Sequence, residues 1–367
     1  MTANQNDTSA PLPCPAMVAW ESPANIALVK YWGKHPVQLP MNPSISFVLR
    51  ESVVRLHMSY TPVSGVDAGL HAFALNGKPN EKFRRRIAGF LESLYPVFPF
   101  LRGMALSIQS ESTFPHSAGI ASSAAAFSAL ALCLCEMERT LEAGASIHRQ
   151  ENLLADTAFL KKASAIARLG SGSACRSLES GFVVWGKTPS LETAHDEYAV
   201  RVNNEHIAPA FLSLRDAVLI VDDTEKKVSS SAGHELMQHH AYREARTAQA
   251  EDNLALMLQA LKTGDEPLFF RVLENEALGL HGLMMSSVPG YILMKPNTIT
   301  LLDKIRDFRD QHQIGMGFTM DAGPNIHLIY FNRDAKQVRE FIAGELSPLC
   351  REGRWIDDAM GDGPRRI

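Results

Sequence analysis

The chain lacks most of the features that would assign it to a specialised class of protein. Its 367 residues include only five cysteines, which are scattered and have no CxxC spacing, so we expect reduced thiols rather than a disulfide framework. The 36 basic residues nearly balance the 40 acidic residues, and a net charge of −4 provides no global field that would attract nucleic acid. No apolar run approaches the length that spans a bilayer, so no membrane partner is expected.

The first residues also lack the basic and apolar regions of a secretory leader, which favours a cytoplasmic location. The polar and proline-containing residues 1–15 are expected to form a flexible N-terminal tail. A content of 46% hydrophobic and 21% charged residues is ordinary for a globular protein. The length exceeds that of one simple core and favours two lobes.

Strand and helix patterns are mixed along the chain and predict an α+β fold. A first strand is expected to begin near Met17, and the turn-bounded apolar runs predict further strands at 104–110, 181–185 and 217–221, with a strand, turn and strand within 317–331. Helical patterns cover residues 122–143, 151–168, 233–262 and 266–285. A polar stretch from 188 to 213 suggests a boundary between an N-terminal lobe, residues 16–205, and a C-terminal lobe, residues 206–367.

The segment from Gly119 to Phe127 is the most informative part of the chain. Small residues and paired serines open directly into a strongly apolar helical pattern. Small side chains let a polyanion approach the backbone, and the free N–H groups and macrodipole of a helix N-terminus attract negative charge. The segment therefore predicts a phosphate site, although a serine-capped core helix would have the same pattern.

Three other segments could hold an anion. Residues 24–34 place Lys30 and Lys34 beside two large aromatic residues; a surface strand with solvated lysines is the alternative. Residues 169–177 form a glycine- and serine-rich loop that ends near Arg176, whose guanidinium can grip a carboxylate or phosphate through two hydrogen bonds. Residues 222–231 supply two lysines and three serines after an apolar strand; they could close over a phosphate or form an ordinary charged turn.

Asp321 emerges from an apolar strand into the turn Ala322-Gly323-Pro324. A carboxylate held rigidly in this way can accept a proton from a substrate, but Asp also commonly stabilises such turns through its own backbone. One other pattern is discarded. His234 and His239 resemble the zinc motif HExxH, yet they are five residues apart, so a helix would direct them to different faces. No metal held by His or Cys is predicted.

Taken together, these segments resemble the diphosphomevalonate decarboxylase family, whose members are ATP-dependent and belong to the GHMP kinase superfamily. The resemblance covers the chain from about Trp20 to Glu345. It depends on four motifs that occur in the family's order: Asn25-Ile26-Ala27 with Lys30-Tyr31-Trp32-Gly33-Lys34, Ala118-Gly119-Ile120-Ala121-Ser122-Ser123-Ala124, Ser171-Gly172-Ser173-Ala174-Cys175-Arg176-Ser177, and Asp321-Ala322-Gly323-Pro324-Asn325. Four matches in order are more specific than any one alone.

The resemblance implies a two-lobed GHMP-kinase-like fold with its active site in a cleft between the lobes. It implies phosphorylation of the 3-hydroxyl of mevalonate 5-diphosphate by ATP, followed by loss of phosphate and CO2 to give isopentenyl diphosphate. It also implies cofactors ATP and Mg2+, with the Mg2+ held mainly by the ATP phosphates, and a homodimer. The implied catalytic residues are Asp321, Arg176 and Lys30; the implied substrate-binding residues are Tyr31, Lys34, Ser171, Gly172, Ser173, Arg176 and Ser230; the implied ATP-binding residues are Gly119, Ala121, Ser122, Ser123, Lys226 and Lys227.

Three places depart from the family pattern, and such departures resemble a bacterial subgroup. They are His116 after Phe114-Pro115, the stretch from His35 to Gln38, and Pro43. Alternatives therefore stay open: a decarboxylase that acts on the monophosphate, a small-molecule kinase of the same superfamily, and a relative that only binds nucleotide. Retention of Asp321 and Arg176 favours the diphosphomevalonate decarboxylase activity.

Overall fold

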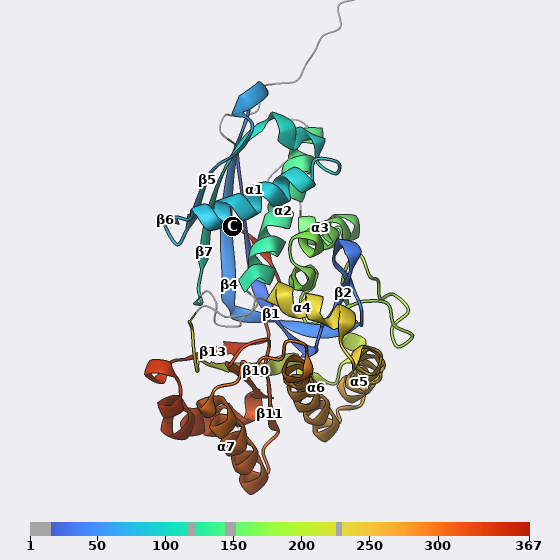
Figure 1. The fold of residues 1–367 in the computed structure, drawn as a ribbon, viewed down its shortest axis with the longest axis vertical. Helices are drawn as coiled ribbons and strands as arrows, with labels where there is room; N and C mark the ends of the chain where they lie inside the picture. The colour runs from blue at the N-terminus through green and yellow to red at the C-terminus, as the bar shows by residue number, and fades with distance from the viewer. Residues whose placement is uncertain (1–15, 116–121, 144–151, 225–229) are drawn as a thin grey trace, which may run out of the picture.

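The structure is a computed structural model that describes residues 16–115, 122–143, 152–224 and 230–367. It is a mixed α+β fold with two principal sheets, one in each half of the molecule (Figure 1). The predicted α+β class is confirmed. Within these ranges, no helix combines the length and the hydrophobicity that a transmembrane span requires.

The first sheet has eight strands and is built around two long strands: β1, which is almost continuously buried, and β4, whose C-terminal half alternates buried and partly exposed residues. The N-terminal part of β4 pairs with β8, and its C-terminal part pairs with β7, so one strand joins two regions of the sheet. All strand pairs of the first sheet are antiparallel except β5 with β7, which are parallel. The strands are β1 (Ala16–Val29), β4 (Ser44–Pro62), β5 (Gly69–Leu75), β6 (Lys78–Pro79), β7 (Met104–Ser112), β8 (Phe182–Trp185), β9 (Val200–Arg201) and β14 (Arg365–Arg366); β2 (Lys34–His35) and β3 (Leu39–Pro40) form a separate small pair.

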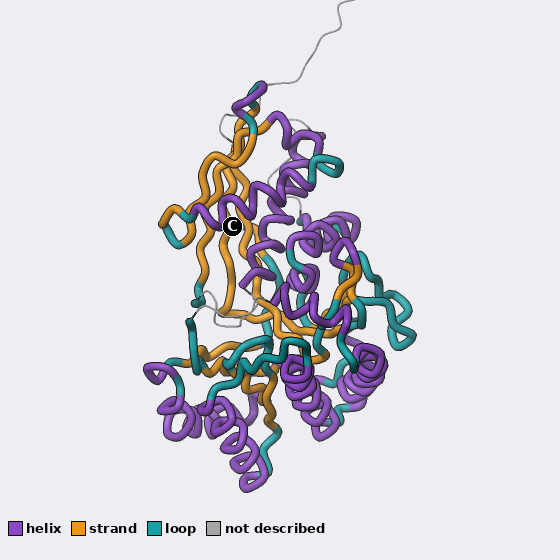
Figure 2. The backbone as a smooth tube through the Cα atoms, viewed as in Figure 1, coloured by secondary structure: helices purple, strands orange, loops and turns teal. Residues whose placement is uncertain are grey.

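Helices α1 (Glu81–Ser93), α2 (Ser122–Ala143) and α3 (Thr157–Gly170) accompany this sheet (Figure 2). The middle of α2 is apolar all round and fully buried, because it lies between β1 and β4 on one side and α3 on the other. Asp156 caps α3 by accepting hydrogen bonds from the backbone N–H groups of Ala158 and Phe159. The predicted helix 122–143 is confirmed, whereas the predicted helix at 151–168 begins only at Thr157.

The second sheet is antiparallel, with the strand order β11 (Met316–Thr319), β12 (Ile326–Phe331), β10 (Leu214–Leu219) and β13 (Trp355–Ala359). Helices α6 (Glu266–Ser286), α7 (Pro296–His312) and α8 (Ala335–Phe341) pack against it, and α5 (Arg243–Thr263) packs against α6 and the first sheet. The predicted helix at 266–285 and the strand, turn and strand within 317–331 are confirmed.

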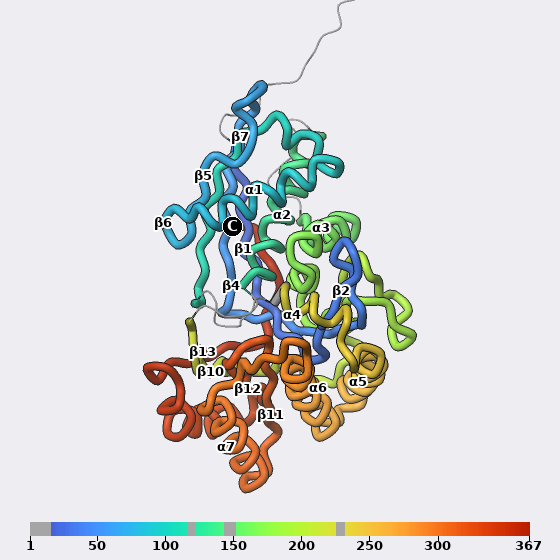
Figure 3. The backbone as a smooth tube through the Cα atoms, viewed as in Figure 1, coloured from blue at the N-terminus to red at the C-terminus, as the bar shows by residue number. Residues whose placement is uncertain are grey.

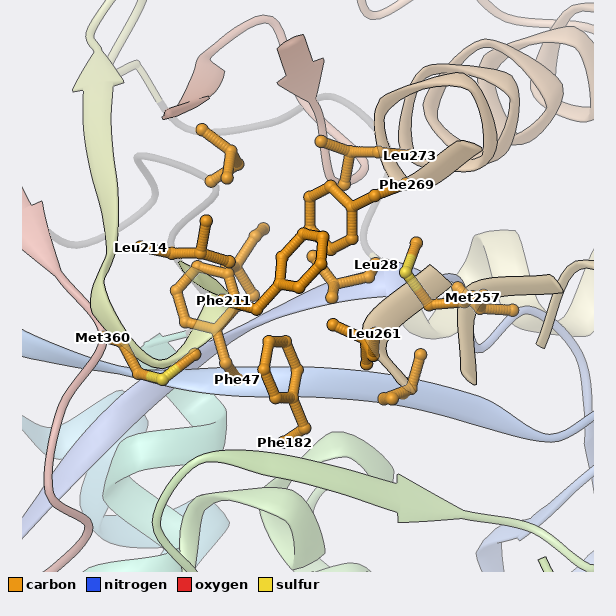
Figure 4. Packing of buried hydrophobic residues seen from close by; sticks show 14 of the residues in the cluster. Leu28, Phe47, Phe182, Phe211, Leu214, Met257, Leu261, Phe269, Leu273 and Met360 are labelled. Carbon is orange, nitrogen blue, oxygen red and sulfur yellow. The ribbon is translucent and has the colours of Figure 1, made fainter. Parts of the chain in front are cut away.

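One hydrophobic core joins the two sheets (Figure 4). Phe47 and Phe182 from the first sheet meet Phe211 and Phe269 from the second half of the chain. The Phe211 ring centroid lies 4.8 Å from that of Phe269, within the range of favourable aromatic pairs. The halves therefore share buried apolar surface instead of folding as separate globules.

The C-terminus crosses between the halves (Figure 3). After β13 the chain returns to the first sheet, where β14 pairs antiparallel with β1. At this crossing the Asp358 carboxylate accepts hydrogen bonds from the backbone N–H groups of Arg50, Glu51 and Ser52 at 2.8–2.9 Å. The carboxylate thus holds the middle of β4 against the second sheet.

The prediction of one continuous helix from 233 to 262 is wrong. The chain instead forms α4 (Ser230–Leu236), a short 3₁₀ turn (Met237–His239) and then α5. His240 is extended and buried, with Nε2 2.9 Å from the Leu283 carbonyl oxygen, and Met237 packs in a cluster with residues of α6. These tertiary contacts bend the chain where local helical propensity would have continued it.

We expect Asp358→Ala to lower the free energy of unfolding by about 3 kcal/mol, because it leaves a buried backbone N–H and two others without an acceptor. Urea denaturation measures the change. Asp362→Ala is the matched control, because Asp362 is 95% exposed and its contact with Arg50 is 3.9 Å long. Equal stability of the two variants would contradict the role of Asp358.

Candidate active site

A buried ion pair lies at the centre of the candidate site. The Lys30 Nζ atom, at the end of β1, lies 2.9 Å from Asp321 Oδ1 in the turn after β11. The lysine side chain is 2% exposed, whereas the aspartate is 27% exposed. Burial lowers the pKa of Lys30, and the charge of Asp321 acts in the opposite direction. The Asp321 carboxylate is therefore partly accessible to a ligand, next to the buried Lys30 side chain.

A second buried pair holds the main chain of Lys30. The Lys30 N–H donates to Glu276 Oε2 at 2.8 Å, and its carbonyl accepts from Arg246 Nη2 at 2.8 Å. Arg246 and Glu276 pair through two hydrogen bonds of 2.7 Å, and Asn253 donates to the same carboxylate at 2.6 Å. Asn42 also donates to the Lys30 carbonyl. Both peptide groups that flank the lysine side chain are thus held by side chains.

Arg176 supplies a buried cation that is held by hydroxyl groups. Its Nε and Nη1 donate to Ser46 at 3.0 Å and Ser44 at 2.6 Å, and its guanidinium lies over the Trp185 ring at 5.9 Å. The side chain is 2% exposed, and no acidic residue of the described chain forms an ion pair with it. Burial lowers the pKa of Arg176, with Asp321 among the nearby charges that oppose this effect. A buried arginine without a carboxylate partner suits an anionic ligand.

Asp321 lies in a turn that side chains hold from both sides. His281 Nε2 lies 3.2 Å from the Asp321 carbonyl oxygen, and Thr298 donates to the Pro324 carbonyl at 2.8 Å. Asn325 accepts from the backbone N–H groups of Val221 and Asp222 at 2.7 and 2.9 Å. This turn thus binds the chain between the end of β10 and the segment that contains Lys226 and Lys227.

The loop after α3 packs tightly against Tyr31. A Cβ atom at Gly172 would lie 2.9 Å from the Tyr31 hydroxyl, so only glycine permits this approach. The Tyr31 ring lies 4.6 Å from that of Trp185, and burial raises the pKa of Tyr31, which keeps the phenol protonated. Ser171 lies 3.2 Å from Ser123 between their hydroxyl oxygens. The loop thereby connects the predicted substrate residues with the start of α2.

Helix α4 and the 3₁₀ turn after it lie against the segment that ends at Lys34. His234 Nδ1 accepts a hydrogen bond from the Gly33 N–H at 3.0 Å, and Gln238 donates to the Lys34 carbonyl at 2.6 Å. The His234 ring also lies tilted against the rings of Tyr31 and Trp32, with centroid distances of 4.3 and 4.7 Å. Burial, with Lys34 and Arg176 nearby, lowers the pKa of His234 to about 3.

The described site residues lie in five segments, and direct contacts join Lys30 to Asp321, Tyr31 to Gly172 and Ser123 to Ser171. Lys30, Tyr31 and Lys34 follow β1; Ser171, Gly172, Ser173 and Arg176 lie in or before a 3₁₀ turn; Ser122 and Ser123 begin α2; Ser230 begins α4; and Asp321 follows β11. Four predicted ATP-binding residues, Gly119, Ala121, Lys226 and Lys227, lie outside the described residues. No group of three or more His, Cys, Asp or Glu that could hold a metal occurs in the described part of the chain.

Several residues that complete the site were not predicted from the sequence. Ser44 and Ser46 alternate with an apolar residue in β4, a pattern that predicts one polar face of a strand. Glu276 is a buried charge in a mostly apolar helix, which is a signal for a buried partner. Neighbouring residues did not indicate a site role for Arg246 or His234. Their partners, Lys30 and Gly33, lie far away in the sequence, directly after β1.

Solved structures share this arrangement of the whole chain. An enzyme designated MDDEF, in complex with MVAPP, AMPPCP and magnesium, is 26% identical and superposes with a TM-score of 0.76 over 96% of this chain and 99% of its own. A mevalonate diphosphate decarboxylase from Legionella pneumophila is 25% identical, with a TM-score of 0.75 over 93% of this chain and 100% of its own. The fold is therefore that of the two-domain, GHMP-like enzymes.

Sequence comparisons identify the family within this class. Residues 22–199 match the diphosphomevalonate decarboxylase-like N-terminal domain, and residues 217–357 match the mevalonate 5-diphosphate decarboxylase C-terminal domain. The diphosphomevalonate decarboxylase of Saccharomyces cerevisiae is 30% identical over 88% of this chain and 79% of its own length. The diphosphomevalonate decarboxylase of Gibberella zeae is 31% identical over 86% of this chain and 81% of its own length. The chain belongs to the diphosphomevalonate decarboxylase family, which confirms the family inferred from the four motifs.

The low pKa of His234 predicts an acid-sensitive contribution to stability. Because the folded-state pKa, about 3, lies below the ordinary value of 6.5, the contribution is complete above pH 6.5 and is lost as pH falls toward 3. As the pH falls through this window, the free energy of unfolding should decrease less in His234→Met than in the wild type. Chemical denaturation measures the difference between the two slopes, which is at most about 1.4 kcal/mol per pH unit. Identical pH dependence of the two proteins would show that His234 titrates normally in the folded state.

Proposed function

We propose that this protein catalyses the ATP-dependent decarboxylation of mevalonate 5-diphosphate to isopentenyl diphosphate, with release of ADP, phosphate and CO2. One observation carries the proposal: the Lys30–Asp321 pair lies beside the buried Arg176, which has no carboxylate partner among the described residues. This arrangement offers a fixed carboxylate for a hydroxyl proton and a cation for a substrate carboxylate. Family membership supports this reaction over others of the same superfamily.

We assign the proton transfer to Asp321. A tertiary hydroxyl must lose its proton as the γ-phosphoryl group arrives, and a positioned carboxylate can accept it. The 2.9 Å contact with Lys30 fixes the carboxylate, and the Lys30 ammonium offsets negative charge that gathers between the substrate oxygen and the phosphoryl group. Lys30 thus belongs to the proposed catalytic set without itself exchanging a proton.

We assign the substrate carboxylate to Arg176. Its contacts with Ser44 and Ser46 fix the plane of the guanidinium and leave donor capacity for a ligand. Holding the carboxylate in one orientation lets the C–C bond break as phosphate leaves and positive charge develops at C3. Tyr31, Lys34, Ser171, Gly172, Ser173 and Ser230 are the proposed contacts for the remainder of the substrate and its diphosphate.

We place the ATP phosphates at the start of α2, against Gly119, Ala121, Ser122 and Ser123. The contact between Ser123 and Ser171 puts this helix end next to the substrate loop. Lys226 and Lys227 are proposed phosphate contacts because the chain on either side of them reaches the site: Asn325 binds Asp222 before them, and His234 binds Gly33 after them. MDDEF was solved with AMPPCP and magnesium, and we propose Mg2+ held mainly by the ATP phosphates.

The remaining assignments extend the proposal to the whole protein. We propose lobes at 16–205 and 206–367, with the active site in the cleft between them, a homodimer and a cytoplasmic location. The tail expected at 1–15 lies outside the described residues. We also propose that the chain belongs to a bacterial subgroup, because of the departures at His116, residues 35–38 and Pro43. Sedimentation velocity tests the dimer.

A coupled assay tests the function. ADP and CO2 release are measured in parallel with mevalonate 5-diphosphate, mevalonate 5-phosphate and mevalonate. We expect equal amounts of ADP and CO2 with the diphosphate. Preference for the monophosphate would identify a phosphomevalonate decarboxylase, ADP without CO2 would identify a small-molecule kinase, and no turnover with any substrate would reject an enzymatic function of this class.

Asp321→Asn should bind both ligands yet lose turnover by about 10²–10⁴-fold or more, because the amide cannot accept the hydroxyl proton. Calorimetry with each ligand and kcat measurements check this result. Circular dichroism confirms the fold, since the substitution also removes the charge that faces Lys30. A variant that keeps a tenth of the wild-type kcat would reject Asp321 as the base.

Arg176→Lys should keep the positive charge but reduce decarboxylation strongly, because an ammonium cannot donate two parallel hydrogen bonds to a carboxylate or occupy both serine contacts. We expect a decrease in kcat/KM of about tenfold or more, measured by CO2 release. If this variant kept the wild-type kcat and KM, the proposal that Arg176 binds the substrate carboxylate through two hydrogen bonds would be wrong.

A further inference from the structure

The Gly33 peptide determines which nitrogen of His234 carries a proton. The Gly33 N–H donates to Nδ1 at 3.0 Å, so Nδ1 must be unprotonated. A neutral imidazole then carries its single proton on Nε2 and is a donor there. The low pKa of His234 keeps this neutral tautomer at physiological pH. The side chain therefore presents a defined N–H group.

This N–H group has no partner in the described chain. No described residue accepts a hydrogen bond from Nε2, and this atom is not among the fully buried polar atoms that lack a partner. The ring is held beside Tyr31 and Trp32, and the charged groups that act on it, Lys34 and Arg176, are both cations. A fixed donor in cationic surroundings suits an anionic acceptor.

We propose that the Nε2–H of His234 donates a hydrogen bond to a phosphoryl oxygen of the substrate. This inference rests on the proposed function, and it adds to the binding site a residue that was discarded as part of a false zinc motif. Asp321 and Arg176 define the reacting end of the substrate, and Lys34 lies beyond Lys30 along the chain. The anionic end then extends toward Lys34, under the His234 ring.

Two substitutions separate the two nitrogens of the imidazole. In His234→Asn the amide oxygen can replace Nδ1 as the acceptor for the Gly33 N–H, but the shorter side chain has no donor at the position of Nε2. In His234→Gln the longer side chain can replace the Nε2 donor. We expect the KM for mevalonate 5-diphosphate to rise about tenfold or more in His234→Asn and to stay within about threefold of wild type in His234→Gln. His239→Asn, at an exposed histidine nearby, is the matched control with wild-type KM.

The reverse order, with His234→Asn close to wild type and His234→Gln impaired, would show that His234 acts only through Gly33 and would overturn the proposal. Equal KM values in the two variants would also overturn it. A second measurement needs no variant: the side-chain ¹⁵N spectrum of the wild type should show the Nε2–H tautomer, with an Nε2 shift when mevalonate 5-diphosphate is added.

An unchanged Nε2 resonance at saturating substrate would reject the contact even if both variants failed to fold. Failure of the proposed function is distinguishable from this result, because wild-type enzyme would then release no ADP with mevalonate 5-diphosphate. Normal wild-type turnover with an unchanged Nε2 resonance would overturn the inference alone.

Discussion

The architecture of the site depends on the burial of one ammonium group. Lys30 is 2% exposed, and an unpaired charge at this depth would be strongly destabilising, so the lysine requires a carboxylate from elsewhere in the chain. Asp321 provides it from the turn after β11, which brings the end of the first long strand against the second sheet. Because such pairs are costly to bury, the pair is better understood as a constraint on position than as a source of stability.

A second buried pair makes this constraint rigid. Arg246 and Glu276, from neighbouring helices α5 and α6, bind each other and also bind the carbonyl and N–H of Lys30. The lysine backbone is therefore fixed independently of its side chain, and movement of either helix would displace the ammonium relative to Asp321. The same helices contribute to the core that includes Phe211 and Phe269, so packing and catalytic geometry are linked through shared elements.

The polar groups around the pair divide into charged and neutral donors. Arg176 and Lys34 supply positive charge, whereas Tyr31 and His234 are kept neutral by burial and present O–H or N–H groups. Neutral donors can surround a polyanion without the mutual repulsion that additional cations would introduce. Since Arg176 is held by serine hydroxyls and not by a carboxylate, its charge remains available for a ligand.

Local sequence patterns were enough to predict the α+β class and the long apolar helices at 122–143 and 266–285, and they supplied the residues that we propose for catalysis and binding. Glycine-rich loops and a carboxylate at a strand end depend on local backbone geometry, so they can be recognised from neighbouring residues. The side chains that hold these groups come from distant parts of the chain and could not be predicted locally: Lys30 meets Glu276 across 246 residues, and His234 meets Gly33 across 201. The tertiary structure also split the predicted helix at 233–262 and returned β14 to the first sheet, because long-range packing outweighs local propensity where the two compete.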